Sequence, residues 1–567
     1  MTGTGSCIIR KDKTILLECG HPGFDAARTA LADYAELVKN LPAYHTYRIT
    51  PLSLWNAASG GRTAEDIIAS LQELSRWGTP AGLEEEIRRL ISRYGRLELH
   101  SHMTDNRLMI LRTDLPALLD ELGEFLVLSG LQLDRSGLME CECPAVNRGL
   151  LKQELTRLGY PVIDMAGYRE GQRLNIAWKE REYHEGASKE NVFGLRDYQR
   201  EAVRLFHGSG GSGVVVLPCG AGKTVVGLAV LEKLQCETLI LTSSTTSVEQ
   251  WREELLQRTN LEAEEIGEYS GERREVRPVT LATYQMLTHR RSKDDPFVHM
   301  NLFKERNWGL IIYDEVHLLP APVFRATADI QATRRLGLTA TLVREDGREG
   351  DVFSLIGPRC YDLPWKSLER QGWIAAVECV EIIVPMESAL RSRYIYAGGK
   401  EQFRLAAGNP AKAEAAGQII AAHSGAAVLV IGQYLDQLEA IADFLEAPLI
   451  TGKTPQRERN ELYAAFNEGS LKVLVVSKVA NFAVNLPDAS VAIEVSGAYG
   501  SRQEEAQRLG RILRPKPGEN KAYFYTLVTG DSREQEFAMR RRLFLTEQGY
   551  EYAVRAGDQQ EEAILLL

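Results

Sequence analysis

The chain has 567 residues, of which 44% are apolar and 25% are charged, so it is long enough to form several globular domains. Its formal net charge of −10 argues against a surface that binds nucleic acid everywhere, although a few placed Arg and Lys side chains would suffice for a local basic channel. We find neither a signal peptide nor an uninterrupted apolar run of about 18 residues, and we expect a cytoplasmic protein without a membrane segment. The eight cysteines lack C-x-x-C spacing, which fits neither a disulfide scaffold nor a zinc ribbon.

The first hundred residues are expected to be mainly helical. The segment TAEDIIASLQELSRWG has Thr63 as a candidate N-cap, an acidic residue three positions later, apolar residues at helical spacing, and Gly78 as a stop. The segment GLEEEIRRLISRYG repeats this pattern and ends at Gly95. We predict a helical accessory domain over residues 1–104 with a short hairpin, whose simplest role is that of a packing or adaptor module.

Residues 105–190 mix strand-like runs, such as EFLVLSG and RLNIAW, with the helical pattern GLLKQELTRLGY. The charged stretch KEREYHEGASKEN that ends this region is typical of a linker. The pattern predicts a second small domain of mixed α and β type.

From about residue 193, short continuous apolar runs alternate with helical segments. Such runs predict buried strands of parallel sheets that are covered on both faces. The predicted fold class is therefore α/β, with two doubly wound parallel-sheet domains in tandem at 191–385 and 413–553. Residues 386–412 would form a short insertion or linker, and 554–567 a mobile tail of acidic and apolar residues. The predicted strands lie at 214–217, 238–242, 279–283, 310–313 and 336–341, and then at 427–432, 448–451, 472–477, 490–495 and 522–528.

The turn between the run VVVL and the next helix carries a phosphate-binding pattern, PCGAGKT. Backbone N–H groups of such a loop surround phosphates, its lysine reaches the β and γ groups, and its hydroxyl ligates Mg²⁺. Leu217 stands where the full eight-residue pattern has Gly, so a chance Gly-rich turn is the alternative. The candidate residues are Gly220, Ala221, Gly222, Lys223 and Thr224.

A second piece of the same chemistry is WGLIIYDEVH, an apolar strand that ends in Asp314 and Glu315. At the carboxyl end of a strand beside the phosphate loop, Asp314 can hold Mg²⁺ through water while Glu315 polarises the attacking water. A solvated acidic strand end is the alternative, but it does not explain why both patterns occur in this order.

A third piece is SRQEEAQRLGRILRPKPG. Gln507, Arg511 and Arg514 have the spacing i, i+4 and i+7, so they share one face of a helix that Pro515 ends. Arginines on such a face suit a γ-phosphate, although a merely solvated basic helix is the rival. Because these arginines belong to the second domain and the phosphate loop to the first, we expect ATP to bind between the two.

These segments resemble the XPB helicases of superfamily 2. The resemblance is continuous from about Leu195 to Val554, and RLMIL, PLSLWNAASGG and SRYGRLEL extend it less sharply toward the N-terminus. It implies two RecA-like domains, with 386–412 as a thumb-like insertion and 105–190 as a region that senses distorted DNA. The segments that carry it are PCGAGKT, DEVH (314–317), LTATLVRED (338–346), QEEAQRLGRILR (503–514) and FLTEQGYEY (544–552).

The resemblance also implies residue roles, with ATP and Mg²⁺ as cofactors. Gln199 in RDYQ would recognise adenine. Ser243, Thr283 and Gln285 would face the nucleic-acid backbone, and hydroxyls at strand ends can bond phosphates without reading sequence. Each of these three residues, taken singly, is more often an ordinary loop residue.

The loop with Arg344, Glu345 and Asp346 is dense in charge. Exposed ion pairs contribute only about 0–1 kcal/mol each, so stability does not explain it, and the acids would repel the phosphates that Arg344 attracts. A solvated loop remains one interpretation, while the resemblance associates this loop with strand separation.

The segment SKVANFAVNLPDA departs from the pattern of the eukaryotic members. Ala480, Asn481 and Asn485 stand where those members usually carry Gly, Asp and Asp, and two carboxylates near the ATP and DNA contacts are thereby lost. The positive charge of Lys478, which we assign to DNA binding, is therefore less well compensated. The efficiency of coupling between hydrolysis and unwinding stays open.

The leading hypothesis is an ATP-dependent DNA helicase or duplex translocase of 3′ to 5′ polarity that acts in DNA repair. We expect it to be cytoplasmic and nucleoid-associated, to act as a monomer on duplex, forked or damaged DNA, and to work with a nuclease or a repair complex. Two alternatives stay open, namely an RNA-remodelling ATPase and an interaction module that ATP switches in shape to recruit repair partners.

Overall fold

The computed structural model divides the chain into two compact units, Met1–Leu217 with Gly222–Asp362 and Pro218–Ala221 with Leu363–Leu567, and each is considered by itself. No helix among the described residues is long and apolar enough to cross a lipid bilayer. The residues that the structure describes are 5–41, 43–179, 194–271, 273–290, 292, 295, 297–331, 333–341, 347–477, 489–497, 505, 508–510, 512, 513, 515 and 520–556.

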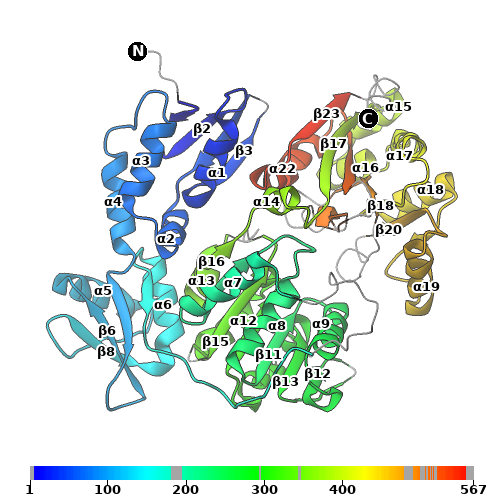
Figure 1. The fold of residues 1–567 in the computed structure, drawn as a ribbon. Coiled ribbons are helices and arrows are strands. Elements are labelled where there is room, and N and C mark those ends of the chain that lie inside the picture. Colours follow the sequence, from blue (N-terminus) through cyan, green and yellow to red (C-terminus); the bar gives the residue numbers. More distant parts are fainter. Residues whose placement is uncertain are drawn as a thin grey trace. The chain divides into compact units, whose positions relative to one another are not determined.

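The N-terminal domain combines a four-stranded antiparallel sheet, in the order β1-β2-β4-β3, with four helices (Figure 1). The expectation of a mainly helical region missed this sheet because its strands are only three to five residues long. The predicted capping pattern is confirmed, since the Thr63 hydroxyl accepts from the Asp66 N–H at 3.1 Å and the Asp66 carboxylate accepts from the Thr63 N–H at 2.9 Å. The elements are β1 Cys7–Ile9, β2 Thr14–Glu18, α1 Phe24–Tyr34, β3 Glu36–Asn40, β4 Tyr44–Arg48, α2 Pro51–Ser59, α3 Ala64–Leu74 and α4 Leu83–Arg93.

Residues 97–167 form what we call the mixed domain, a five-stranded sheet in the order β7-β8-β6-β5-β9 with two helices. Because β5 pairs antiparallel with β6, the boundary that we placed between residues 104 and 105 falls inside a hairpin and is wrong. The elements are β5 Leu97–Ser101, β6 Leu108–Thr113, α5 Pro116–Leu128, β7 Asp134–Arg135, β8 Glu140–Pro144, α6 Arg148–Arg157 and β9 Val162–Asp164.

The first RecA-like domain, residues 194–362, contains a seven-stranded sheet in the order β12-β13-β11-β14-β15-β10-β16, and every pairing in it is parallel. The five strands that the apolar runs predict are all present, whereas β12 and β16 at the two sheet edges were missed. The elements are α7 Asp197–Gly208, β10 Ser212–Val216, α8 Lys223–Leu234, β11 Thr238–Thr242, α9 Thr245–Arg258, β12 Ile266–Tyr269, β13 Val279–Thr283, α10 Tyr284–Leu287, α11 Leu302–Glu305, β14 Leu310–Asp314, α12 Ala321–Asp329, β15 Arg334–Thr339, α13 Glu349–Leu355 and β16 Arg359–Asp362.

Both faces of this sheet are buried, as the continuous apolar strands predict. Alternate residues of β10, β11 and β14 pack in one core with apolar residues of α10 to α13. On the other face α8 lies so close to α9 that a Cβ on Gly227 would come within 2.4 Å of the Trp251 ring and 3.4 Å of Leu338.

The second RecA-like domain, residues 363–556, contains a second seven-stranded parallel sheet, in the order β19-β20-β18-β21-β22-β17-β23. The elements are α14 Trp365–Arg370, β17 Ala376–Val384, α15 Ser388–Tyr396, α16 Gly399–Ala407, α17 Ala411–Ala422, β18 Val428–Gly432, α18 Leu435–Leu445, β19 Leu449–Ile450, α19 Gln456–Asn467, β20 Val473–Ser477, β21 Val491–Glu494, β22 Lys521–Thr529, α22 Glu534–Glu547 and β23 Tyr552–Ala556.

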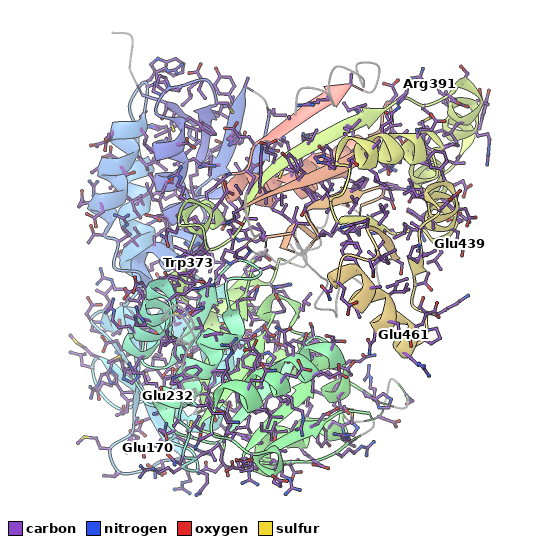
Figure 2. All side chains as sticks on the ribbon, turned by 45° about the vertical axis from the view of Figure 1, so that its right-hand side comes forward. Glu170, Glu232, Trp373, Arg391, Glu439 and Glu461 are labelled. Atoms are coloured by element: carbon purple, nitrogen blue, oxygen red, sulfur yellow. The ribbon has the colours of Figure 1, made fainter. Side chains whose placement is uncertain are left out.

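Three of the predicted boundaries change in this domain. Strand β17 pairs with β22 and β23, so the first domain ends near residue 362 and not at 385. Residues 386–412 pack on the second domain, where the Phe403 ring lies 4.6 Å from that of Phe537, and Arg391, labelled in Figure 2, pairs with Asp531. Residues 554–556 belong to β23, and the rest of the predicted tail lies outside the described residues.

We expect Ile312→Ala in β14 to lower the stability of the first RecA-like domain by about 2–5 kcal/mol, because Ile312 is fully buried in the centre of the sheet. The matched variant Ile312→Val should cost only about 0.5–1.5 kcal/mol. Native-state hydrogen exchange of the β11, β14 and β15 amides measures both effects. Equal protection in the two variants would contradict tight packing around this side chain.

Candidate active site

The candidate site lies along the carboxyl edge of the sheet in the first RecA-like domain. Parallel pairing places the ends of five strands side by side there, since Thr242 of β11 is opposite Thr283 of β13, and Asp314 of β14 is opposite Leu338 of β15. Val216 of β10 is in turn opposite Thr339 of β15. Ligands of parallel α/β sheets bind at this edge.

The phosphate-binding pattern occupies the turn from β10 to α8. Gly220 and Gly222 adopt left-handed φ angles of 78° and 80°, which suit glycine and disfavour other residues. Gly222 is the N-cap of α8, whose first N–H groups have no partners within the helix, so this end of α8 can bind an anion. Lys223 begins the helix and Thr224 follows it, both partly exposed, as the pattern predicts.

Gln199 lies directly beside this turn. A Cβ on Gly222 would come within 2.6 Å of the Gln199 side-chain nitrogen, so any other residue at position 222 would have to displace the end of this side chain. The Gln199 side-chain oxygen accepts from the Arg196 N–H at 2.9 Å, which fixes the amide at the start of α7. The structure therefore brings together Gln199 and the phosphate-binding turn, which are distant in the sequence.

Asp314 and Glu315 reach the same place from the end of β14. The Lys223 ammonium lies 3.7 Å from the Glu315 carboxylate. Asp314 accepts a hydrogen bond from the Trp251 indole N–H at 2.9 Å and another from the Glu315 N–H at 3.0 Å. Glu315 has a left-handed φ of 50°, a strained conformation for a residue with a side chain, and such strain is concentrated at functional sites.

The electrostatics of Asp314 differ from those of an ordinary surface carboxylate. Burial and the neighbouring Glu315 charge raise the pKa of Asp314 to about 6, while the Trp251 hydrogen bond and Lys223 oppose the rise. Two adjacent carboxylates with one lysine leave negative charge at the strand end. A divalent cation would compensate for that charge.

A short series of polar contacts connects the acidic strand end to the end of β15. His317 lies 3.4 Å from the Glu315 carboxylate, and its Nδ1 lies 2.6 Å from the Thr339 hydroxyl. The Thr339 hydroxyl also accepts from the Thr341 N–H at 3.1 Å. These polar contacts extend as far as Thr341, shortly before Arg344 in the sequence.

The predicted DNA-facing residues of the first domain have different environments. Ser243 is partly exposed directly after β11, and Gln285 is exposed on α10. Thr283 is buried, and its hydroxyl accepts from the Met286 N–H at 3.1 Å as the N-cap of α10. The Thr283 hydroxyl therefore has a structural role that the strand-end argument did not foresee.

Several candidates lie outside the described residues. Among their neighbours, Arg508 pairs with the buried Glu494, and the Tyr552 hydroxyl donates to Glu505 at 3.1 Å. The second unit thus anchors part of the segment that carries the predicted arginine face. The candidates not described are Arg344, Glu345, Asp346, Lys478, Gln507, Arg511 and Arg514.

Sequence reasoning did not identify Trp251 and Tyr284 at this site. Trp251 bonds to the Asp314 carboxylate, and the Tyr284 hydroxyl donates to the Asp314 carbonyl at 2.8 Å. Both residues are buried aromatics in helices, so nothing in the local sequence separates them from core residues.

Three protein-family models match parts of the chain. The model of the ERCC3/RAD25/XPB C-terminal helicase matches residues 368–564. The model of the type III restriction enzyme res subunit matches 192–344, and a helicase conserved C-terminal domain model matches 7–137.

Similar proteins align over nearly the whole chain. A "DNA 3'-5' helicase XPB" from Kineococcus radiotolerans is 50% identical over 98% of this chain and 97% of its own length. The protein of the same name from Mycobacterium tuberculosis is 49% identical over 98% of each chain. The "General transcription and DNA repair factor IIH helicase/translocase subunit XPB/SSL2" of Saccharomyces cerevisiae is 31% identical over 96% of this chain and 71% of its own. The chain therefore belongs to the XPB family of superfamily 2 DNA helicases.

Proposed function

We propose that this chain is an ATP-driven 3′ to 5′ DNA helicase or duplex translocase that acts in DNA repair. The observation that carries the proposal is the approach of Lys223 to within 3.7 Å of Glu315, with Asp314 and the left-handed Gly220 and Gly222 on the same sheet edge. The names of the relatives as DNA 3'-5' helicases support DNA as the substrate and the polarity.

The residues at the sheet edge fit ATP with Mg²⁺. A glycine turn at a helix N-terminus suits phosphates, and a hydroxyl with a neighbouring carboxylate suits Mg²⁺, so we assign Thr224 and Asp314 as its ligands, partly through water. When bound, the cation would neutralise charge that develops on the transferred phosphoryl group.

The chain's own side chains then divide the work. Lys223 would neutralise the β- and γ-phosphates, and Gln199 would hold the adenine next to the turn. Glu315, oriented by its strained backbone, would accept the proton of the attacking water. Trp251 would hold the Asp314 carboxylate in one orientation.

The remaining roles rest on spacing and family resemblance. We assign Gln507, Arg511 and Arg514 to the γ-phosphate, and Ser243, Gln285 and Lys478 to the DNA backbone. We keep Thr283 as a contact to the DNA backbone, made through its main chain or through its hydroxyl proton at the N-terminus of α10. The proposal also includes a nuclease or a repair complex as partner. The chain would act as a monomer on forked or damaged DNA, and it would be located in the cytoplasm at the nucleoid.

We expect Lys223→Ala and Glu315→Gln each to lower the kcat of ATP hydrolysis by at least about 100-fold, since the first removes the cation at the phosphates and the second removes the general base. Lys233→Ala, the same change on an exposed position of the same helix, should leave turnover within about 2-fold. Steady-state ATPase assays with no nucleic acid, with forked or duplex DNA, and with matched RNA measure these effects. Turnover that is equal with and without DNA would overturn the proposal, and preferential stimulation by RNA would favour an RNA-remodelling ATPase.

Gly222→Ala tests the arrangement of the phosphate-binding turn. Its Cβ would displace the end of the Gln199 side chain from the turn, and the left-handed φ would add strain of about 1–2 kcal/mol, so we expect ATP affinity to fall by more than about 30-fold. Gly220→Ala has a similar φ but meets nothing within 4 Å, and should weaken binding by roughly 10-fold only. Titration with a fluorescent ATP analogue decides between them, and equal losses would argue against contact between Gln199 and this turn.

We propose that the loop with Arg344, Glu345 and Asp346 converts movement of the protein along DNA into separation of the two strands. In the triple variant Arg344→Ala/Glu345→Ala/Asp346→Ala we expect DNA-stimulated ATP hydrolysis within about 2-fold of normal, and strand displacement on a forked duplex reduced by at least about 10-fold. Arg348→Ala, which changes the next exposed arginine, is the control. Full displacement by the triple variant would show that the loop only solubilises this part of the chain.

A further inference from the structure

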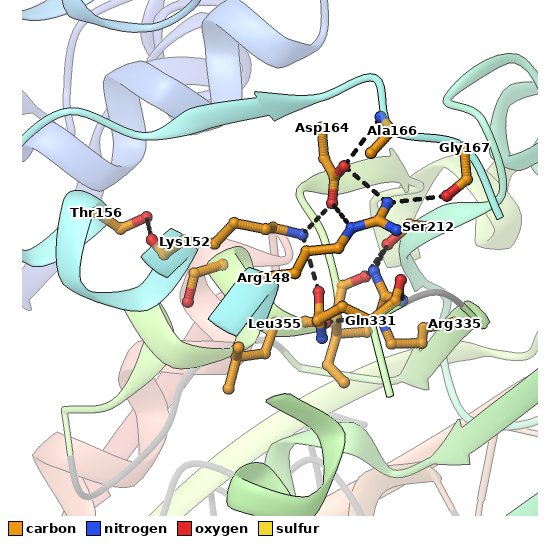
Figure 3. Close-up of polar contacts among 12 residues, drawn as sticks. Arg148, Lys152, Thr156, Asp164, Ala166, Gly167, Ser212, Gln331, Arg335 and Leu355 are labelled. Atoms are coloured by element: carbon orange, nitrogen blue, oxygen red, sulfur yellow. Dashed lines mark hydrogen bonds and ion pairs between the residues drawn. The ribbon is translucent and has the colours of Figure 1, made fainter. Parts of the chain in front are cut away.

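A buried ion cluster connects the mixed domain to the first RecA-like domain (Figure 3). From the mixed domain, Arg148 of α6 binds Asp164 of β9 through two nitrogens, at 2.7 and 3.0 Å. The Lys152 ammonium, also on α6, lies 2.9 Å from Asp164 and donates to the Gln331 side-chain oxygen of the first RecA-like domain at 3.0 Å. Lys152 is therefore bonded to both domains at once.

The side of the cluster that belongs to the first RecA-like domain is also held by several hydrogen bonds. Gln331 donates through its amide nitrogen to the carbonyls of Thr327 and Leu355, at 2.8 and 3.0 Å, so its oxygen is turned toward Lys152. The fully buried Arg335 of β15 donates to the Leu355 carbonyl at 2.7 Å and to the Ser212 hydroxyl at 3.0 Å. The acceptor for Lys152 is thus fixed by the last turn of α12 and by the end of α13.

Tyr168, just after the mixed domain, lies close to two guanidinium groups. The Arg148 guanidinium is 5.2 Å from the centre of its ring and that of Arg335 is 5.3 Å away, so one aromatic ring contacts cations of both domains. Arg148 also donates to the Gly167 carbonyl at 2.9 Å, which holds the chain on its way to this ring.

The main chains of the two domains also meet directly. A Cβ on Gly149 of α6 would come within 2.3 Å of the Ala328 carbonyl oxygen of α12, so α6 can lie against α12 only with glycine at this position. Nearby, Gln153 of α6 donates to Asp351 of α13. On the same helix α13, the Phe353 ring lies 6.4 Å from the Tyr94 ring and 6.5 Å from the Trp55 ring of the N-terminal domain.

The cluster is better suited to fixing a geometry than to adding stability. Burial lowers the pKa of Lys152, and the Asp164 carboxylate opposes that change. Removing ions from water costs about as much as their attraction returns, whereas directional bonds to several partners allow only one arrangement of the groups. Apolar packing alone would let α6 slide over α12 and α13.

We propose that the mixed domain and the first RecA-like domain form one rigid arm of the motor, with Lys152 as the positioning residue that joins Asp164 to Gln331. The mixed domain then moves with the first RecA-like domain, and DNA held by one is held in a fixed orientation to the other. This inference goes beyond the proposed function, and only its DNA readout rests on that function.

Two variants open the joint by different means. Lys152→Met keeps an unbranched side chain that is one atom shorter, and it removes both polar contacts. Gly149→Ala favours helix α6 itself but places a methyl group against Ala328, so the joint and not the helix should yield. Arg157→Gln removes a cation from an exposed position of the same helix, paired only at the surface with Glu154, and is the matched control.

Hydrogen exchange of the full-length chain measures the joint directly. In both joint variants we expect exchange of the α6, α12 and α13 amides to quicken by at least about 10-fold, while β5, β6 and β8 stay protected because the mixed domain remains folded. Arg157→Gln should exchange like the unaltered chain. Unchanged protection of these helices in both joint variants would overturn the proposal.

Activity assays test the consequence for the motor. We expect both joint variants to keep DNA-stimulated ATP hydrolysis within about 2-fold, and to lose at least about 5-fold in strands displaced per ATP hydrolysed on a forked duplex. A normal displacement ratio in variants whose joint exchanges rapidly would also overturn the rigid arm. If the unaltered chain gave no stimulation by DNA, the proposed function would fail, and the exchange measurement would still decide the joint.

Discussion

The parallel pairing of β13, β11, β14, β15 and β10 is the constraint on which the candidate site depends. Parallel strands present all their carboxyl ends at one edge, so Thr283, Ser243, Asp314, Thr339 and the phosphate-binding turn become neighbours although the sequence separates them. Burial of both faces keeps the sheet rigid, and the candidate side chains can then be placed on short turns without a further scaffold. The contact between Lys223 and Glu315 is the point where two of these turns meet.

Much of this edge could be predicted from the sequence, because it depends on local patterns. Continuous apolar runs identify the central strands, and the glycine turn and the acid pair each need only a few adjacent residues. The same local logic fails for β17, in which Glu378 and the buried Glu381 interrupt the apolar run. Inside the second domain Glu381 lies 3.4 Å from Arg542. It also fails for the four-stranded N-terminal sheet, whose strands of three to five residues are too short to be recognised one at a time.

The residues that support the site are harder to predict than those that form it. Trp251 and Tyr284 orient Asp314, yet in the sequence they are indistinguishable from core aromatics, because their role comes from a polar atom at the edge of a buried ring. Thr283 shows the reverse case, since a hydroxyl at a strand end suggested a ligand contact and the structure uses it to cap α10. A prediction of roles from spacing alone therefore overestimates contacts with ligands and misses the groups that hold them.

The ion cluster at Lys152 explains how the accessory domains would move together with the motor. Helix α13 contacts both α6 of the mixed domain and Trp55 of the N-terminal domain, and it begins shortly after the strand β15 that ends at Thr339. The same helix therefore contacts both accessory domains, and in the sequence it follows the strand that ends at the candidate site. Since a buried and satisfied polar network permits one arrangement where apolar packing permits several, a displacement of that sheet edge would be passed to the accessory domains as a movement of the whole arm. The network costs little in stability and removes a hinge between the mixed domain and the first RecA-like domain. A motor needs such a rigid connection where force is transmitted and not where it is generated.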